Sequence, residues 1–208
     1  MPIDKPGLKL IAEIKRKSPS KGIIRNDFDP QKIATEFKSK ASCISVLTDQ
    51  NFFGGSSEIF QVVRSILPTT PLLRKDFIID PYQIYETRLM KADIILLIMR
   101  CLDDVQVLNF IKLSLNLGLN ILLETHDRSE VYRATNILNK LNKEDYKDKL
   151  IIGINSRNLD TFEVSLDGAI KLKSSLPDDI LTIAESGILS TNDLDKVNKA
   201  NFDFTLIG

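Results

Sequence analysis

The segment at residues 93–99 limits the fold most narrowly, because it reads Asp-Ile-Ile-Leu-Leu-Ile-Met with almost no polar interruption. A strand that is apolar on both faces is typical of a parallel sheet covered by helices on both sides. Similar short apolar runs recur along the chain and alternate with segments of helical periodicity. We therefore expect an α/β fold built on parallel strands.

The alternation continues through all 208 residues without a break in composition. The expected strands cover residues 8–14, 43–47, 71–74, 93–99, 119–124, 150–154, 180–184 and 202–207. The expected helices start at residue 30 and at residues 57, 81, 104, 129, 166 and 191, while residues 142–149 look like a charged linker. Eight strands with seven intervening helices predict a single domain over residues 1–208 with the (β/α)8 TIM-barrel fold.

Polar residues end most of the expected strands, and this favours a barrel over the alternative, a doubly wound open sheet. The strand-end residues are Lys15, Lys75, Glu124, Asn155 and Glu185. In a barrel these ends converge on one mouth, where the active sites of this fold lie.

Two of these strand ends carry lysines with plausible chemistry. Glu13 and Lys15 are two residues apart, so in a strand they share a face. Lys75 follows an apolar strand, and we expect burial and nearby cations to lower its pKa enough for general-acid catalysis. The plainer alternative for both lysines is a solvated charge at a strand end.

Glu124 and His126 follow the expected fifth strand. Glu124 is a candidate general base, with a carboxylate favoured by a helix N-terminus as the alternative. We expect His126, the only histidine, to point away from the mouth as a structural or exposed residue. A lone histidine predicts no metal site.

The turns after the last three strands are candidates for a phosphate site. Arg157 lies two residues beyond Asn155, the pair Ser186-Gly187 follows the seventh strand, and Gly208 ends the eighth. Backbone N–H groups of such turns bind phosphate in many barrels.

Composition excludes several classes of function. Lys plus Arg and Asp plus Glu each total 28, so no basic excess points to nucleic acid. No apolar run approaches the ~18 residues of a membrane span. Cys43 and Cys101 lack metal or disulfide spacing and read as reduced thiols, which favours the cytoplasm.

Seven segments together resemble indole-3-glycerol phosphate synthase, a barrel lyase of tryptophan biosynthesis. The matching segments are 11–15, 18–22, 47–49, 53–56, 73–77, 153–159 and 184–188, and they occur in the family's order. The resemblance implies conversion of 1-(2-carboxyphenylamino)-1-deoxyribulose 5-phosphate to indole-3-glycerol phosphate, with release of CO₂ and water. It implies no metal and no organic cofactor. The implied partners are this phosphorylated small molecule and other enzymes of the tryptophan pathway.

The resemblance also implies a role for each motif residue. Lys75 resembles the general acid that protonates the substrate carbonyl, Lys15 the partner of the anthranilate carboxylate, and Glu124 the base of the dehydration. Glu13 and Asn155 resemble orienting residues, and Glu185 a residue near the substrate hydroxyls. The residues that resemble the phosphate and substrate cradle are Ser18, Arg157, Ser186, Gly187 and Gly208, with Phe77 and Leu96 as apolar walls.

Compared with the family, the chain looks short at both ends. We expect it to lack the helical extension that precedes the first strand and the helix that follows the last one. A catalytically impaired barrel that only binds phosphate or a partner is therefore the alternative function. A related phosphosugar isomerase is a third, but it needs a Cys/Asp acid–base pair, and we expect neither Cys43 nor Cys101 at the mouth.

Overall fold

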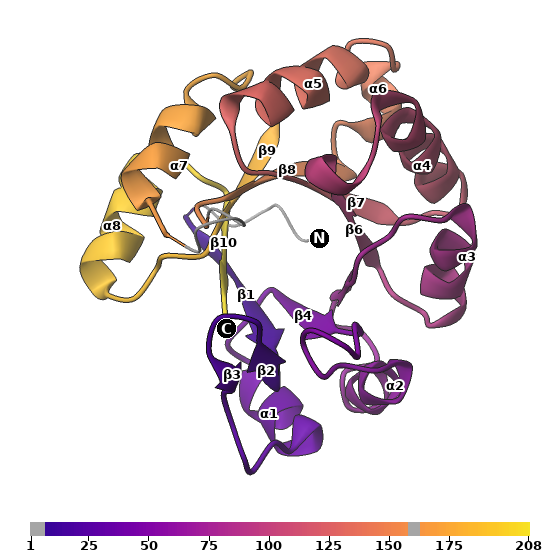
Figure 1. Ribbon diagram of the computed structural model, residues 1–208, viewed down its shortest axis with the longest axis vertical. Helices are drawn as coiled ribbons and strands as arrows, with labels where there is room; N and C mark the ends of the chain where they lie inside the picture. Colours follow the sequence, from indigo (N-terminus) through magenta and orange to yellow (C-terminus); the bar gives the residue numbers. More distant parts are fainter. Residues whose placement is uncertain (1–6, 158–162) are drawn as a thin grey trace.

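A computed structural model describes residues 7–157 and 163–208 and shows a closed barrel of parallel strands ringed by helices (Figure 1). The strand order is β1-β10-β9-β8-β7-β6-β5-β4, and β4 pairs back with β1 to close the ring. The predicted (β/α)8 TIM barrel is confirmed, and closure excludes the open sheet.

The elements lie within two residues of the predicted strand positions. The barrel strands are β1 (Lys9–Ile14), β4 (Cys43–Leu47), β5 (Leu72–Lys75), β6 (Ile94–Ile98), β7 (Asn120–Thr125), β8 (Leu150–Asn155), β9 (Leu181–Glu185) and β10 (Phe204–Ile207). The helices are α1 (Pro30–Phe37), α2 (Ser57–Ile66), α3 (Pro81–Leu89), α4 (Asp104–Asn116), α5 (Arg128–Leu138), α6 (Lys143–Tyr146), α7 (Leu166–Lys173) and α8 (Thr191–Lys199); the 3₁₀ turn η1 (Met99–Cys101) follows β6.

A side-chain cap starts each of these α-helices. The capping residues are Asp29, Ser56, Asp80, Asp103, Asp127, Asn142, Ser165 and Ser190, and each accepts a backbone N–H of its own first turn. A cap satisfies N–H groups that the helix itself leaves unpaired. The caps thereby fix where most strand-to-helix loops end, and these loops form the barrel mouth.

Alternate strand positions fill the barrel interior with apolar side chains. The buried interior residues are Ile11, Cys43, Leu73, Ile94, Leu96, Ile98, Leu122, Ile151, Ile183, Phe204 and Leu206. The intervening positions face outward and pack against the helices in two further clusters, which include Ile95, Leu123 and Val46. The barrel is therefore a packed core, and a ligand must bind above it, at one end.

Two segments differ from the sequence-based predictions. The basic turn after β1 forms a small antiparallel hairpin, β2 (Lys17–Ser18) with β3 (Gly22–Ile23). The backbone N–H of Lys17 reaches the carbonyl of Phe53 at 3.3 Å, which ties this hairpin to the β4–α2 loop. The prediction of a linker over residues 142–149 was wrong, because this segment contains the helix α6, whose Tyr146 is buried in the outer core.

None of the helices in the described parts of the chain combines the length and the apolar character that a membrane crossing needs.

Candidate active site

The carboxyl ends of the strands place a cluster of charged side chains at one end of the barrel. Lys75 ends β5, and its ammonium group donates to Oε2 of Glu185 at 2.6 Å and to Oε2 of Glu124 at 3.2 Å. The Lys75 side chain is 15% exposed, and the Glu124 and Glu185 side chains are 5% and 1% exposed. One lysine thus lies between two buried carboxylates, and it remains within reach of a ligand at the mouth.

The charge of Lys75 differs from the prediction. Burial lowers the pKa of Lys75, but the carboxylates of Glu185 and Glu124 outweigh burial and raise this pKa above its ordinary value. The expectation that nearby cations would lower the Lys75 pKa was wrong, because the groups that contact its ammonium are the carboxyl groups of Glu124 and Glu185. Lys75 is therefore fully protonated at neutral pH and has a proton to donate.

The two carboxylates that share Lys75 are driven apart in pKa. Burial and the charge of Glu124 raise the pKa of Glu185 to about 8. Burial also acts on Glu124, but Lys75 and His126 outweigh it and hold the Glu124 pKa well below its usual range. Two close carboxylates with separated pKa values are a typical acid–base arrangement.

Glu185 owes its place to a missing side chain on the neighbouring strand. A Cβ atom at Gly153 in β8 would lie 2.3 Å from Oε1 of Glu185 and 2.8 Å from Cδ1 of Leu122. Oε1 of Glu185 is buried and has no hydrogen-bond partner within the described residues. Glu185 is therefore packed against β8 through Oε1, and it meets Lys75 through its other oxygen, Oε2.

Asn155 ends β8 and joins the same cluster. Its amide Nδ2 donates to Oε1 of Glu124 at 3.3 Å, and its Oδ1 accepts the backbone N–H of Arg157 at 3.1 Å. Asn155 therefore links the Glu124 carboxylate to the turn that follows β8.

Glu13 and Lys15 form a second ion pair at the end of β1. Lys15 Nζ lies 2.6 Å from Oε1 of Glu13, and Ser45 Oγ donates to Oε2 of the same carboxylate at 3.4 Å. The Glu13 side chain is 6% exposed and that of Lys15 is 23% exposed. The pair lies on one side of the strand, as its two-residue spacing predicts, with the lysine the more open partner.

His126 contradicts the prediction that it points away from the mouth. Its side chain is 2% exposed, and its Nε2 lies 3.1 Å from Oε1 of Glu124. His126 comes two residues after Glu124, so the two-residue period of a strand places both side chains on the same side. The two-residue spacing of Glu124 and His126 was visible in the sequence and should have predicted that both side chains lie on the same side.

The candidate phosphate residues lie on neighbouring turns. Ser186 and Gly187 after β9 both have left-handed backbones, with φ of +63° and +75°. A Cβ at Gly187 would lie 2.6 Å from Val164 Cγ1 and 3.0 Å from Ser156 Oγ, so this turn packs closely on the chain that follows β8. Asn158 and Leu159 of the predicted motif lie outside the described residues.

The remaining cradle and wall candidates occupy different depths. Gly208 lies beside the Glu13 side chain, because a Cβ atom built on Gly208 would lie 3.1 Å from the Cβ of Glu13. Ser18 Oγ accepts the backbone N–H of Lys21 within its own hairpin. Phe77 is half-buried at the mouth and contacts Phe52, with ring centroids 5.9 Å apart. Leu96 is only 2% exposed and belongs to the packed interior.

The two cysteines are free thiols. Cys43 lies in the barrel interior, where burial raises its pKa to about 12. Cys101 lies in η1, which directly follows the carboxyl end of β6, so the expectation that no cysteine lies near the mouth was wrong for Cys101. Burial and the charges of Glu124 and Glu130 raise the Cys101 pKa, which keeps that thiol protonated.

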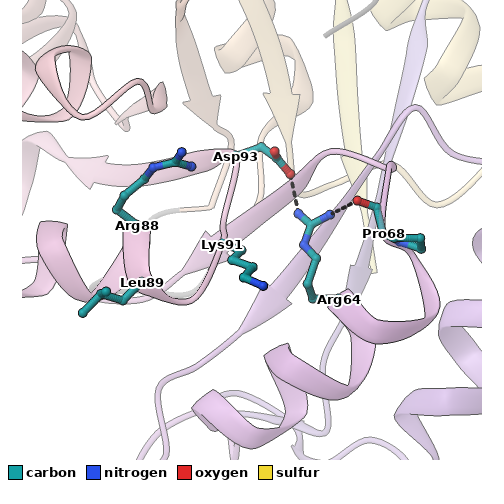
Figure 2. A pocket seen from close by; sticks show the side chains of 6 residues that line it. All are labelled: Arg64, Pro68, Arg88, Leu89, Lys91 and Asp93. Carbon is teal, nitrogen blue, oxygen red and sulfur yellow. Dashed lines mark hydrogen bonds and ion pairs between the residues drawn. The ribbon is translucent and has the colours of Figure 1, made fainter.

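A surface hollow at the opposite end of the barrel is structural. Figure 2 shows Arg64, Arg88 and Lys91 around it, with Arg64 ion-paired to Asp93 and donating to the carbonyl of Pro68. Asp93 also accepts the backbone N–H of Leu72 at 2.8 Å. These bonds tie together the loops that precede β5 and β6, at the end of the barrel that usually serves stability.

Within residues 7–157 and 163–208, no three His, Cys, Asp or Glu side chains are grouped to hold a metal ion.

The fold is shared with several solved enzymes of low sequence identity. 3-Hexulose-6-phosphate synthase superposes with a TM-score of 0.68 at 13% identity, covering 97% of this chain and 90% of that one. N-acetylmannosamine-6-phosphate 2-epimerase from Clostridium perfringens gives 0.69 at 11% identity, covering 99% and 88%. At these identities the likeness establishes the TIM-barrel fold alone.

Sequence comparison is far more specific. The model of the family "Indole-3-glycerol phosphate synthase" matches residues 4–208. The indole-3-glycerol phosphate synthase of Chlorobium chlorochromatii (strain CaD3) is 44% identical over 203 residues, or 97% of this chain and 75% of that protein. The one from Polaromonas naphthalenivorans (strain CJ2) is 45% identical over 200 residues, or 96% and 72%. The chain therefore belongs to the indole-3-glycerol phosphate synthase family, as its motifs predicted.

Proposed function

We propose that this chain closes the indole ring of indole-3-glycerol phosphate from 1-(2-carboxyphenylamino)-1-deoxyribulose 5-phosphate, releasing CO₂ and water. Family membership supports the reaction. The single observation that supports this chain's own activity is the Lys75 ammonium group, held at the mouth between Glu124 and Glu185.

Lys75 serves as the general acid. In the first stage the ring carbon that carries the carboxylate attacks the ketone carbon, and Lys75 protonates the ketone oxygen as the new bond forms. The carboxylate then leaves as CO₂, and its bonding electrons restore the aromatic ring. The anions that raise the Lys75 pKa keep its proton in place until the substrate arrives.

Lys15 holds the anthranilate carboxylate before it leaves. Its side chain is the more exposed member of the Glu13–Lys15 pair, so its ammonium group can turn to a ligand while Glu13 stays buried. The Ser45 bond to the other oxygen of Glu13 keeps that carboxylate in position. A charge-assisted contact of this kind orients the flexible substrate for ring closure.

Glu124 acts as the base of the dehydration: it takes a proton from the CH₂ group beside the ring nitrogen, and the electrons of that C–H bond form the indole double bond. The hydroxyl formed in the first stage leaves with a proton from the medium, as water. The low pKa of Glu124 keeps it ionised at neutral pH, and Asn155 fixes one of its oxygens. Glu185 lies beside it and contacts Lys75, and the family resemblance assigns Glu185 to the neighbourhood of the substrate hydroxyls.

The phosphate binds at the turns after β8, β9 and β10, which contain Arg157, Ser186, Gly187 and Gly208. Left-handed backbone at Ser186 and Gly187 and the close packing of the β8 and β9 turns support this assignment. Ser18 approaches from the hairpin, and Phe77, backed by Phe52, forms an apolar wall beside the aromatic ring. Leu96 supports that wall from the packed interior.

The wider assignments follow from the family and the barrel. We infer a single domain over residues 1–208, since β1 and β10 pair directly. A biosynthetic enzyme of this family is expected in the cytoplasm, beside other enzymes of the tryptophan pathway, without a metal or organic cofactor.

The test is indole fluorescence from the synthetic substrate, with Lys75→Ala as the comparison. The wild-type chain is expected to form product, and Lys75→Ala to lose at least about 100-fold in kcat. Lys75→Ala removes the acid yet leaves both carboxylates, so circular dichroism must show that it folds. Folded wild-type protein that forms no product would support the alternative, an impaired barrel that only binds phosphate or a partner.

A further inference from the structure

His126 joins the proposed base to a second buried carboxylate outside the site. Its Nε2 lies 3.1 Å from Oε1 of Glu124, and its Nδ1 lies 3.1 Å from Oε2 of Glu130 in α5. The Glu130 side chain is 7% exposed. No step of the proposed reaction uses His126 or Glu130, although they extend the charged cluster from the mouth to the helix layer.

We propose that His126, held in place by Glu130, is a positioning residue that orients the Glu124 carboxylate toward Lys75 and keeps it ionised as the base of the dehydration. This inference rests on the proposed function, since it assigns a use to the same carboxylate.

Glu130 is built to hold the imidazole ring. Its Oε2 accepts the backbone N–H of His126 at 2.8 Å and also faces Nδ1 of the His126 ring. The backbone and the ring of His126 therefore both contact this one oxygen. Its Oε1 accepts Nε of Arg100 at 2.9 Å. The cap residue Asp127 accepts the Glu130 backbone N–H at 2.9 Å. With both oxygens engaged, Glu130 has little freedom to turn.

The partners of His126 require a proton on each ring nitrogen. A carboxylate only accepts hydrogen bonds, so Nδ1 must donate to Glu130. Nε2 then faces a second carboxylate, that of Glu124. If Nε2 carried no proton, its lone pair would repel the carboxylate oxygen, because both atoms would be acceptors. The Nε2 hydrogen is not aimed along a hydrogen bond, so the contact with Glu124 is an ion pair of the imidazolium.

Electrostatics supports the cationic form. Burial lowers the pKa of His126, but the contacts with the carboxylates of Glu124 and Glu130 outweigh it and raise the pKa to about 9. The other charged or titratable groups nearby are Lys75 and Glu185 beyond Glu124, Arg100 and the neutral Cys101 thiol in η1, and Asp127 at the start of α5. The imidazolium is therefore fully present at neutral pH and is lost as the pH rises through about 9.

Direct titration tests the charge without any need for activity. His126 is the chain's only histidine, so its imidazole proton NMR signals need no assignment by mutation. The wild-type signals should titrate near pH 9, and Glu130→Gln and Glu124→Gln should each move the midpoint to lower pH. A wild-type midpoint near the ordinary value of about 6.5 would overturn the proposal.

Kinetics tests the positioning. In His126→Gln the cation is gone, so the Glu124 pKa should rise and the acidic limb of the kcat profile should move up by about 1 pH unit. At neutral pH Glu124 stays ionised in both proteins, so the expected fall in kcat of about 10-fold, with KM within twofold, reports the lost orientation of the carboxylate. Glu130→Gln leaves the His126 ring in place, so it should move the acidic limb of the kcat profile in the same direction as His126→Gln but by a smaller amount.

Arg128→Gln is the matched control, because it removes an exposed cation from the same end of α5. It should leave the acidic limb in place. Should His126→Gln fold, lose thermal stability and keep the wild-type limb, His126 would only tie β7 to α5 and the positioning role would be wrong. If the wild-type chain proved inactive, the proposed function would fail, while the titration would still report the charge.

Discussion

At the scale of single residues, the site depends on an absent side chain as much as on charged ones. Gly153 in β8 leaves the space that Oε1 of Glu185 occupies, 2.3 Å from where a Cβ would lie. Glu185 contacts Lys75 through its other oxygen, Oε2. The position of the Lys75 ammonium group is therefore coupled to the lack of a methyl group on the neighbouring strand.

We predict that Gly153→Ala will lower both stability and activity. The new methyl group must displace either the Glu185 carboxylate or Leu122, and such overpacking costs about 1–3 kcal/mol of unfolding free energy. kcat/KM should fall at least about 10-fold as Lys75 loses its closest partner. Urea unfolding and the fluorescence assay measure the two effects.

Ile152→Val is the matched control on the same strand. Ile152 is fully buried but belongs to the outer core, and losing one methylene there costs about 0.5–1.5 kcal/mol. It should lower stability without lowering kcat/KM. Equal activity in Gly153→Ala and wild type would contradict the coupling of Gly153 to the site.

The residues of the site could be predicted from sequence better than their electrostatics. Lys75, Glu124 and Glu185 converge because strand ends in a barrel must converge, and the sequence shows where the strands end. The pKa of Lys75 depends instead on which strand ends face each other across the mouth. That pairing is a property of the closed barrel, so the groups beside Lys75 are the carboxyl groups of Glu124 and Glu185 instead of the expected cations.

At the scale of elements, a buried arginine ties β5 to the helix that follows it. Arg74 faces outward and donates to Thr48 Oγ1 at 3.2 Å, to the Gln83 carbonyl at 3.0 Å and to Asp76 Oδ2 at 3.0 Å. Asp76 Oδ1 in turn accepts the backbone N–H of Phe77 at 2.9 Å. Arg74 thereby anchors the loop that follows Lys75 and carries Phe77.

We predict that Arg74→Met will lower the free energy of unfolding by about 3–5 kcal/mol. Methionine retains the apolar stem but leaves the Asp76 carboxylate partly buried without its cation, which is the costly way to break an ion pair. Urea unfolding measures the change. Arg88→Met, an exposed position on α3, should stay within about 0.5 kcal/mol of wild type. A loss of under 1 kcal/mol in Arg74→Met would contradict the anchoring role.

The elements that sequence reasoning missed are the ones held by distant contacts. The hairpin of β2 and β3 has only two residues per strand, and its support comes from Phe53 and Asn51 of another loop. α6 has four residues and is anchored by Tyr146 in the outer core. Neither segment has enough local periodicity to predict it, whereas the long apolar strands have.

At the scale of the whole molecule, the barrel closes through the two ends of the chain. β10 lies between β9 and β1, with Thr205 in register with Ala184 on one side and Leu10 on the other. Glu13 lies on β1, Lys15 directly follows this strand, and Gly208 follows β10 beside Glu13. The strand that carries Glu13 is therefore held by β10 on one side and by β4 on the other.

We predict that Thr205→Pro in β10 will open the barrel at β1. Proline removes a ladder N–H from a strand paired on both sides and should cost about 3 kcal/mol or more. Hydrogen–deuterium exchange should show faster exchange of the β1 amides as well as those of β10, although β1 itself is unchanged. Thr205→Val, which keeps the N–H and the branched shape, should retain wild-type protection in β1. If β1 stayed protected in Thr205→Pro, pairing with β4 alone would suffice to hold it, and closure through β10 would not be what positions Glu13 and Lys15.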